Sequence, residues 1–390
     1  MSKRIEIMKP GLGLGGATFD VAAVGEALHS GLGHDVHLTA GTIDEASRRF
    51  LASRALLDVT IIPELDRFHP DHSVERLDSI VRAHDQETVM FNQAFQSGPF
   101  ALAALRRALR VEPRRSVLMV PNDFPTSQFE MLEAMPQGVK CWVVNPGYIP
   151  FLSQYNDGLD YGTLPSPLDV KRFRPESTEQ TAAIRAQVRS RHGVTDEDIM
   201  LFQPTRVHPQ KDLKLSVDFA CELQVKSGRT VRLVVAGGNE VLEDSRRFQT
   251  EVEAYAQAKG YTSLVLVGGI ADANGRGNRM SDYFWAADAA IMPSAIDAAP
   301  NTLGEAAYCG LPIVTTKFGD AFLEDTFTPL YGQFDTTLIS RDEPLAPKAE
   351  ALLTLFDTPN LLATSIEHNH QLSKAFSVET LPDLLRILMA

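Results

Sequence analysis

Cysteine is scarce in this chain, whose 390 residues include only three. Cys141, Cys221 and Cys309 lie far apart, and no two of them form a CxxC pair. Disulfide frameworks and structural zinc sites need closely spaced sets of cysteines, so the sequence predicts neither. Free thiols are typical of a reducing compartment, and we therefore expect a cytoplasmic protein.

Long apolar segments are missing as well. No stretch approaches the roughly 20 apolar residues that a membrane-spanning helix needs. The opening residues, MSKRIEIMKPG, lack the apolar run of a signal peptide. We expect no transmembrane segment, while peripheral contact with a membrane surface stays open.

Basic residues are outnumbered, because 37 lysines and arginines face 50 aspartates and glutamates, for a net charge of −13. A broad nucleic-acid-binding surface is strongly basic, so this balance argues against nucleic acid as a partner. A local basic pocket is compatible with it.

Several catalytic signatures are absent. The sequence contains no HExxH, GxSxG or Walker A motif and no H-x-E…P-C-x-x-C pattern, which argues against several hydrolase, NTPase and deaminase classes. Its ten histidines do not cluster with metal-ligand spacing. We predict no metal site and no bound cofactor.

What the sequence does contain is an alternation of short apolar runs with helical patterns. Strands that alternate with helices form parallel sheets with crossover helices, which predicts doubly wound α/β structure. A chain of 390 residues is too long for one ordinary core, so we expect two such domains. The expected strands lie at residues 5–7, 36–39, 59–62, 89–91, 117–120 and 141–144, and then at 200–203, 231–236, 264–267, 289–292 and 313–316.

A change of composition separates the two halves. Residues 161–181 are rich in Pro, Ser, Thr and charged side chains, which is typical of a linker. We predict an N-terminal domain over residues 1–165, a linker over 166–180, a C-terminal domain over 181–368 and a helical segment over 369–390.

A glycine-rich turn follows the first expected strand. Gly11, Gly13 and Gly16 satisfy GxGxxG between a strand and a helix, which is the dinucleotide-binding context. A nicotinamide site also needs an acid at the end of the second strand, which is expected to end near Gly41 with no acid until Asp44. The pattern favours a turn that approaches a phosphate closely, and a plain turn without a ligand stays open.

Two cations follow the strand expected at residues 200–203. Arg206 and Lys211 would lie at its carboxyl end, the edge where open α/β sheets bind ligands. Arginine can bind phosphate bidentately and lysine acts as a point charge, so the pair suits a diphosphate. A solvated pair of surface cations is the alternative.

Two acids follow the strand expected at residues 289–292. Thr302 and Glu305 form a capping-box pattern, which predicts a helix that starts near Thr302 with Glu305 at its third position. The free N–H groups of that helix start suit an anion. Asp297 and Glu305 together suit a ligand rich in hydroxyls, because each carboxylate accepts several hydrogen bonds. An ordinary cap and an ordinary loop acid are the alternatives.

Taken together, these motifs resemble those of the retaining glycosyltransferases of the two-domain GT-B fold, the superfamily that includes glycogen synthase and sucrose-phosphate synthase. Arg206 and Lys211 match the family's Arg-x4-Lys pair. Asp297 and Glu305 match its Glu-x7-Glu motif, and residues 305–314 match the EAxxCGxPVV segment. Further echoes are the glycine loop, GHDV at residues 33–36 and SPLDVKRFRP at residues 166–175.

The resemblance implies two doubly wound Rossmann-like domains facing a cleft, and transfer of a hexosyl group from a UDP- or GDP-sugar to an acceptor hydroxyl with retention of configuration. Arg206 and Lys211 would hold the donor diphosphate without a metal, while Asp297 and Glu305 would bind sugar and ribose hydroxyls. The segment 369–390 would return to the N-terminal domain. Further donor contacts would come from Gly13, Gly15, Gly16, Gly269, Ile270, Asn301, Thr302 and Leu303.

The acceptor would be bound by the first domain. The acidic composition and the lack of a basic amphipathic helix favour a small soluble acceptor, and a homo-oligomer stays open. The candidate residues are polar ones near strand–helix junctions, where an ordinary turn role is the alternative: His84, Asn92, Asn122 and Asp123.

Two departures from the family pattern keep other functions open. The first acid is Asp297 rather than glutamate, and Asn122-Asp123 stands where many members have histidine. The alternatives are a nucleotide-sugar 2-epimerase of the same fold and a non-catalytic nucleotide-sugar-binding relative. A nicotinamide oxidoreductase is opposed by the missing strand-end acid.

Overall fold

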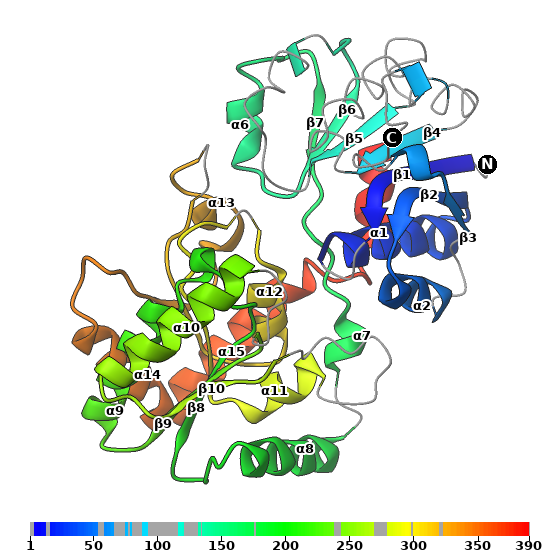
Figure 1. The fold of residues 1–390 in the computed structure, drawn as a ribbon. Helices are drawn as coiled ribbons and strands as arrows, with labels where there is room; N and C mark the ends of the chain where they lie inside the picture. Colours follow the sequence, from blue (N-terminus) through cyan, green and yellow to red (C-terminus); the bar gives the residue numbers. More distant parts are fainter. Residues whose placement is uncertain are drawn as a thin grey trace. The chain divides into compact units, whose positions relative to one another are not determined.

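The structure of the chain is a computed structural model (Figure 1). By its internal contacts it divides into two compact units, which are taken one at a time below. The first comprises Met1–Pro167, Ala321–Leu330 and Phe376–Ala390, and the second comprises Leu168–Asp320 and Tyr331–Ala375. The structure describes residues 4–12, 16–53, 58–65, 75–76, 79, 88–92, 116–120, 132–133, 135–174, 177–237, 243–268, 279–297, 299–319 and 323–389.

The first unit is built on a parallel sheet in the order β3-β2-β1-β4-β5-β6-β7. The chain adds β2 and β3 on one side of β1 and β4 to β7 on the other, so the direction of winding reverses between β1 and β4. The elements described here are β1 (Arg4–Leu12), α1 (Gly16–Glu26), the π-helix η1 (Ala27–Gly31), β2 (Asp35–Ile43), α2 (Glu45–Ser53), β3 (Asp58–Ile61), η2 (Pro63–Leu65), β4 (Thr88–Asn92), β5 (Ser116–Val120), β6 (Lys140–Val143), α6 (Tyr148–Leu152) and β7 (Asp160–Thr163).

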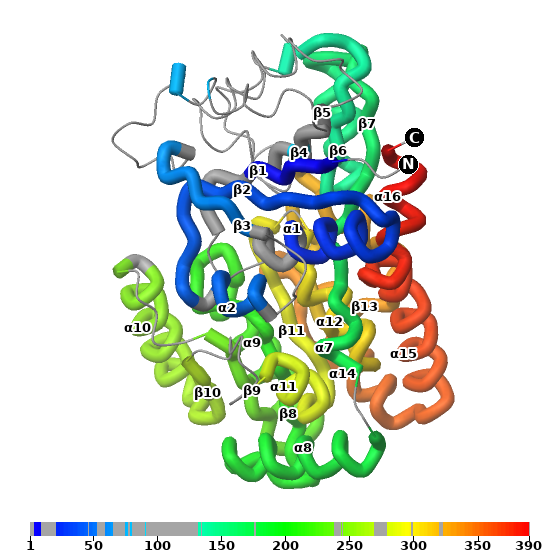
Figure 2. Tube along the Cα trace, turned by 90° about the vertical axis from the view of Figure 1, so that its right-hand side faces the viewer, coloured from blue at the N-terminus to red at the C-terminus, as the bar shows by residue number. Residues whose placement is uncertain are grey.

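Helix α16 (Leu381–Met389) packs closely against this unit, beside η1 (Figure 2). A Cβ added at Gly31 would come within 2.6 Å of Pro382, and one added at Gly162 within 2.6 Å of Leu388. Both glycines are thus needed for close approach. Leu385 is fully buried whereas Ile387 is 73% exposed, as expected of an amphipathic helix that covers a core.

The second unit has a parallel sheet in the order β10-β9-β8-β11-β12-β13, and its winding reverses between β8 and β11. Every residue of β8 and β11 is buried, which fits central parallel strands. The elements are α7 (Val170–Phe173), α8 (Thr178–Arg191), β8 (Ile199–Gln203), the 3-10 turn η6 (Pro209–Lys211), α9 (Leu213–Ser227), β9 (Val231–Val235), α10 (Glu243–Ala258), β10 (Leu264–Leu266), α11 (Met280–Ala286), β11 (Ala289–Met292), α12 (Asn301–Tyr308), β12 (Ile313–Thr315), α13 (Phe327–Tyr331, which begins in the first unit), β13 (Thr336–Leu338), α14 (Ala346–Asp357) and α15 (Pro359–Lys374).

The fold corrects two expectations about the first unit. Strand β1 extends to Leu12, so Gly11 pairs with Thr42 in the sheet and does not belong to a turn. Strand β2 runs to Ile43, so Asp44 does stand directly at a strand end. Its carboxylate accepts a hydrogen bond from Ser47 N (2.6 Å) and caps α2, which is a local structural role.

Two strands were not expected from the sequence. Strand β7 occupies residues 160–163, where composition indicated the start of a linker. Strand β13 is only three residues long, Thr336–Leu338, too short for its pattern to stand out. Among the helices that the structure describes, none is long and apolar enough to cross a membrane.

Candidate functional site

Lys211 is fixed at the carboxyl end of β8 through its backbone. The buried amide of Gln203, the last residue of β8, donates from Nε2 to the Lys211 carbonyl (2.9 Å). Ser216 Oγ in turn donates to Gln203 Oε1 (2.7 Å). A fully buried amide with both ends satisfied is a rigid support, so the position of Lys211 is set by the core.

Arg206 lies on the loop between β8 and η6, with an exposed side chain. Gly237, just after β9, packs against this loop and donates from its N–H to Thr205 O (2.9 Å). A Cβ at Gly237 would stand 2.5 Å from Val207 N and 2.7 Å from Arg206 Cα, so only glycine fits. Within the described part of the chain, no group bonds to the Arg206 guanidinium.

Asp297 follows β11 and contacts Lys211, which follows the neighbouring strand β8. The loop after β11 is tied to η6 by Ala295 N, which donates to Gln210 O (2.8 Å), and to the segment after β12 by Asp297 N, which donates to Gly319 O (3.0 Å). The Asp297 carboxylate forms an ion pair with Lys211 Nζ, and both side chains are largely buried. Ser294 Oγ also donates to Asp297 Oδ2 (3.2 Å).

Helix α12 corrects the expected capping box. Its first residue is Asn301 and its N-cap is Pro300, which offers no side-chain acceptor. Thr302 is therefore the second helical residue and Glu305 the fifth, so the two do not cap the helix. Asn301, Thr302 and Leu303 do form its first turn, in which Leu303 N donates to Pro300 O (3.1 Å).

Glu305, at the fifth position of α12, is a half-buried acid. Burial raises its pKa from about 4.5 to about 7, and the charge of Arg172 opposes this rise. Burial also raises the pKa of the neighbouring Cys309 thiol, to which the Glu305 charge adds. No hydrogen bond to the Glu305 carboxyl arises from the residues that the structure describes, so its acceptor capacity is available to a ligand.

The structure thus brings four candidate residues to one edge. Arg206 and Lys211 follow β8, Asp297 and Glu305 follow β11, and these adjacent parallel strands flank the point where the winding reverses. Open α/β sheets bind ligands at this switch point. Cations and helix N–H groups there suit an anion, and the acids suit hydroxyls.

Sequence reasoning missed the residues that support this edge. Gln203 and Ser294 are buried polar side chains, at 0% and 2% exposure. A signal existed for the first, since Gln203 is the one polar residue closing the apolar run IMLFQ. Ser294 carried no distinguishing pattern.

Only some of the other candidate residues lie among those that the structure describes. Gly16 is the first residue of α1, shortly after β1, and Asn92 is the last residue of β4, so both lie near the carboxyl ends of the switch-point strands of the first unit. No group of three or more potential metal ligands occurs among the residues described. The candidates that lie outside the described residues, and stay predictions, are Gly13, Gly15, His84, Asn122, Asp123, Gly269 and Ile270.

Comparison with known proteins agrees with this geometry. Residues 199–355 match the family model described as "Glycosyl transferases group 1", while no curated protein matches the sequence. HepE of Anabaena, solved with UDP and glucose, aligns at 13% identity over 99% of this chain and 98% of that one, with a TM-score of 0.74. A Rickettsia africae glycosyltransferase and the sucrose-phosphate synthase of Thermosynechococcus elongatus each align at 15% identity over the same shares, with TM-scores of 0.73 and 0.71.

These likenesses establish the class first: the chain has the GT-B fold, with two Rossmann-like domains. The resemblance inferred from its motifs is confirmed in the fold, and residues 199–355 match the model of the group 1 glycosyltransferases. That segment contains Arg206, Lys211, Asp297 and Glu305 together with the strands that position them.

Proposed function

We propose that the protein is a cytoplasmic retaining glycosyltransferase, which moves a hexosyl group from a UDP- or GDP-sugar to a hydroxyl of a small soluble acceptor. The observation that carries this proposal is the pairing of Lys211 with Asp297 beside the exposed Arg206, at the switch point of the second unit. The group 1 family match over the same residues supports it.

The donor diphosphate would lie between the two cations and the start of α12. The Lys211 ammonium has three N–H donors, so it can keep Asp297 and still donate to phosphate oxygens. Arg206 supplies a planar fork that suits a second pair of oxygens. Backbone N–H groups at Asn301 and Thr302 would add the partial positive charge of the helix end.

The two acids would bind the hydroxyl-rich parts of the donor. Glu305, one turn into α12, would accept hydrogen bonds from the ribose hydroxyls, and in its ionised form both of its oxygens accept. Asp297 would reach the sugar hydroxyls with its carboxylate group, which the contacts with Lys211 and Ser294 orient.

In the reaction, the bond between the sugar C1 and the phosphate oxygen breaks and a bond from C1 to the acceptor oxygen forms. The acceptor proton passes to the leaving diphosphate on the same face of the sugar, which retains the configuration. Negative charge builds on the leaving oxygen, and preorganised cations stabilise it most in that state. A divalent metal is not required by this scheme.

The first test is binding. Ligands that bind only the folded state raise its melting temperature by mass action, so UDP-, GDP- and ADP-sugars are compared at equal concentration. We expect one UDP- or GDP-sugar to stabilise the protein. The Lys211→Ala variant should lose this shift, and Lys226→Ala, which removes a surface ion pair to Glu350 in the same unit, should keep it.

The second test is turnover. We expect Lys211→Ala and Glu305→Ala each to lower transfer by about 100-fold or more, the scale of losing one preorganised charge or donor. Near-normal turnover in both would sink the site assignment. Interconversion of the nucleotide-sugar without any acceptor would favour an epimerase, and tight donor binding without turnover a binding protein.

A further inference from the structure

Asp212, directly after Lys211, has an unusual backbone. Its φ and ψ are 43° and 53°, the left-handed region, and it is the one non-glycine residue with positive φ in the described part of the chain. This conformation is unfavourable for an L-residue with a side chain and persists only where the surroundings enforce it. It lets the chain turn from η6 directly into α9, with Lys211 at the corner.

Two side-chain interactions hold Asp212 in this conformation. Its carboxylate accepts from Leu215 N (3.3 Å), which caps α9. Arg341, on the segment between β13 and α14, binds the same carboxylate with Nε at Oδ2 (2.9 Å) and a terminal nitrogen at Oδ1. Such a two-pronged pair fixes orientation as well as distance.

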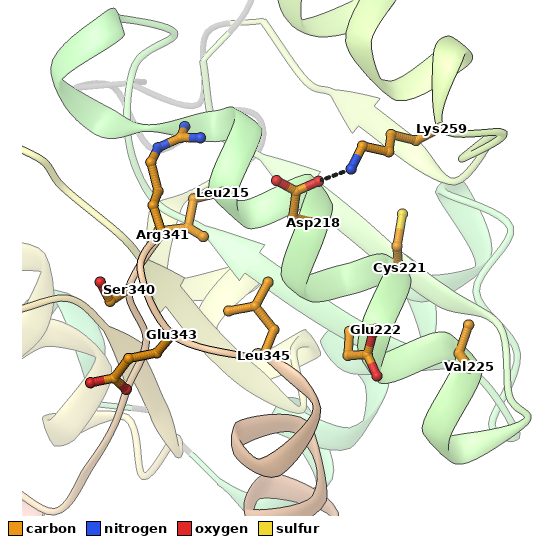
Figure 3. Close-up of a pocket in the computed structure, with 10 residues that line it drawn as sticks. All are labelled: Leu215, Asp218, Cys221, Glu222, Val225, Lys259, Ser340, Arg341, Glu343 and Leu345. Atoms are coloured by element: carbon orange, nitrogen blue, oxygen red, sulfur yellow. Dashed lines mark ion pairs between the residues drawn. The ribbon is translucent and has the colours of Figure 1, made fainter.

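The Arg341 side chain is reachable from outside. It is 52% exposed, whereas that of Asp212 is 12% exposed. Arg341 lines a cavity of about 390 Å³ between α9, the end of α10 and the start of α14. Figure 3 shows it extending past Leu215, at the N-terminal end of α9, away from Val225 at the other end.

We propose that Arg341 is a positioning residue for Lys211. By holding Asp212 in the left-handed conformation it keeps Lys211 pointed at Asp297, and hence at the donor phosphates. The inference rests on the proposed function for its effect on transfer, but its effect on Lys211 is independent of that function. Gln203 fixes the carbonyl of Lys211 from the core, and Arg341 fixes the turn that follows it.

The test compares full-length variants that separate positioning from stability. Arg341→Ala removes the pair, and Arg341→Lys leaves a point charge that cannot bind both oxygens. Asp212→Gly adopts the left-handed conformation freely and is tolerated at an N-cap, so adding it to Arg341→Ala should restore what the single variant loses. Lys226→Ala is the control for loss of an unrelated ion pair on the same unit.

Two measurements are made on each variant. The first is the rate at which acetic anhydride acetylates Lys211, read by mass spectrometry against Lys374 in the same sample. The second is kcat and KM with the best-binding nucleotide-sugar. We expect Arg341→Ala to raise Lys211 acetylation and to lower kcat by about 10- to 100-fold, the scale of a misplacement near 1 Å. Arg341→Lys should give intermediate values of the acetylation rate and of kcat. The double variant should recover the wild-type values of both.

The outcomes are distinct. Unchanged acetylation and kcat in Arg341→Ala, even with a lower melting temperature, would overturn the inference and leave the pair a stabilising contact. Failure of Asp212→Gly to rescue would also contradict it. If the wild-type protein neither binds nor transfers a nucleotide-sugar, the proposed function fails, and the acetylation rates still decide whether Arg341 positions Lys211.

Discussion

The two parallel sheets reverse their winding in the same way but use their buried polar side chains differently. In the first unit Glu6, 2% exposed in β1, accepts a hydrogen bond from Thr39 in β2, so the interaction joins neighbouring strands within the sheet. In the second unit Gln203, fully buried in β8, bonds outward to the Lys211 carbonyl. One polar group ties strands together and the other supports a loop.

The two buried polar groups therefore differ in what they stabilise. A buried polar group costs stability unless it is paired, so each must serve something. The pair in the first unit serves the sheet itself, while the one in the second unit carries the rigidity of the core to a charged edge. Loss of Gln203 would disturb Lys211, whereas loss of Thr39 would disturb only the strands that it joins.

The largest contrast should come from one substitution beside the charged edge. In Gly237→Ala the new Cβ would clash with backbone atoms of Arg206 and Val207, which cannot rotate away. Overpacking of this kind costs about 1–3 kcal/mol. Because the strain falls on the Arg206 loop, we expect the affinity for the nucleoside diphosphate of the best-binding donor, measured by calorimetry, to fall by about tenfold, which corresponds to about 1.4 kcal/mol.

The matched control lies in the first unit. Gly31→Ala places a Cβ equally close to Pro382 and should destabilise the docking of α16. It should leave the affinity for the same nucleoside diphosphate within about twofold of the wild-type value, which corresponds to about 0.4 kcal/mol. An equal loss of nucleotide affinity in Gly237→Ala and Gly31→Ala would contradict the expected difference between the two units.

A smaller effect should appear in the pH dependence of stability. Burial raises the pKa of Glu305 from about 4.5 to about 7 in the folded state. Between these values the folded state holds a proton that the unfolded state has lost, so stability falls as pH rises from about 4.5 to about 7 and levels off above it. Allowing for partial exposure, we expect a total loss of about 1–2 kcal/mol.

Urea unfolding of the wild-type protein and of Glu305→Gln, at intervals from pH 5 to pH 8, would measure this. The glutamine cannot titrate, so its stability should fall less over the same range. The difference in unfolding free energy between wild type and Glu305→Gln should be largest below pH 6. Above pH 7.5 this difference should no longer change with pH. Parallel curves over the whole range would show that Glu305 titrates as an ordinary exposed acid.

Much of the second unit could be predicted from its pattern because its strands are short, apolar and regularly spaced. The expected strand at residues 289–292 agrees with β11 at both ends. The length of β2 could not be predicted, because the residues HLTAGTI after Val36 carry no signal for a strand end, and pairing with β1 sets where the strand stops.

The charged residues of the candidate site could be predicted from the sequence, but the residues that hold them in place could not. Arg206, Lys211, Asp297 and Glu305 have the spacing of a known motif, so their residue types point to their chemistry. The partners Gln203, Ser294 and Arg341 are distant in sequence or ordinary in type, and only packing brings them to the site. The predicted capping box is wrong because the N-cap of α12 is Pro300, two residues before Thr302.

The smallest expected effect is a gain of stability from a substitution inside α12. Gly304 lies inside this helix, and an added Cβ would meet no atom of the described residues within 4 Å. Gly304→Ala should therefore stabilise the protein by about 0.5–1 kcal/mol, because alanine loses less backbone freedom on folding. Gly310→Ala is the opposing control, since Gly310 has a φ of 75° and an alanine there is strained. Calorimetric melting should move up for the first and down for the second, and a fall in both would mean that α12 has no room at Gly304.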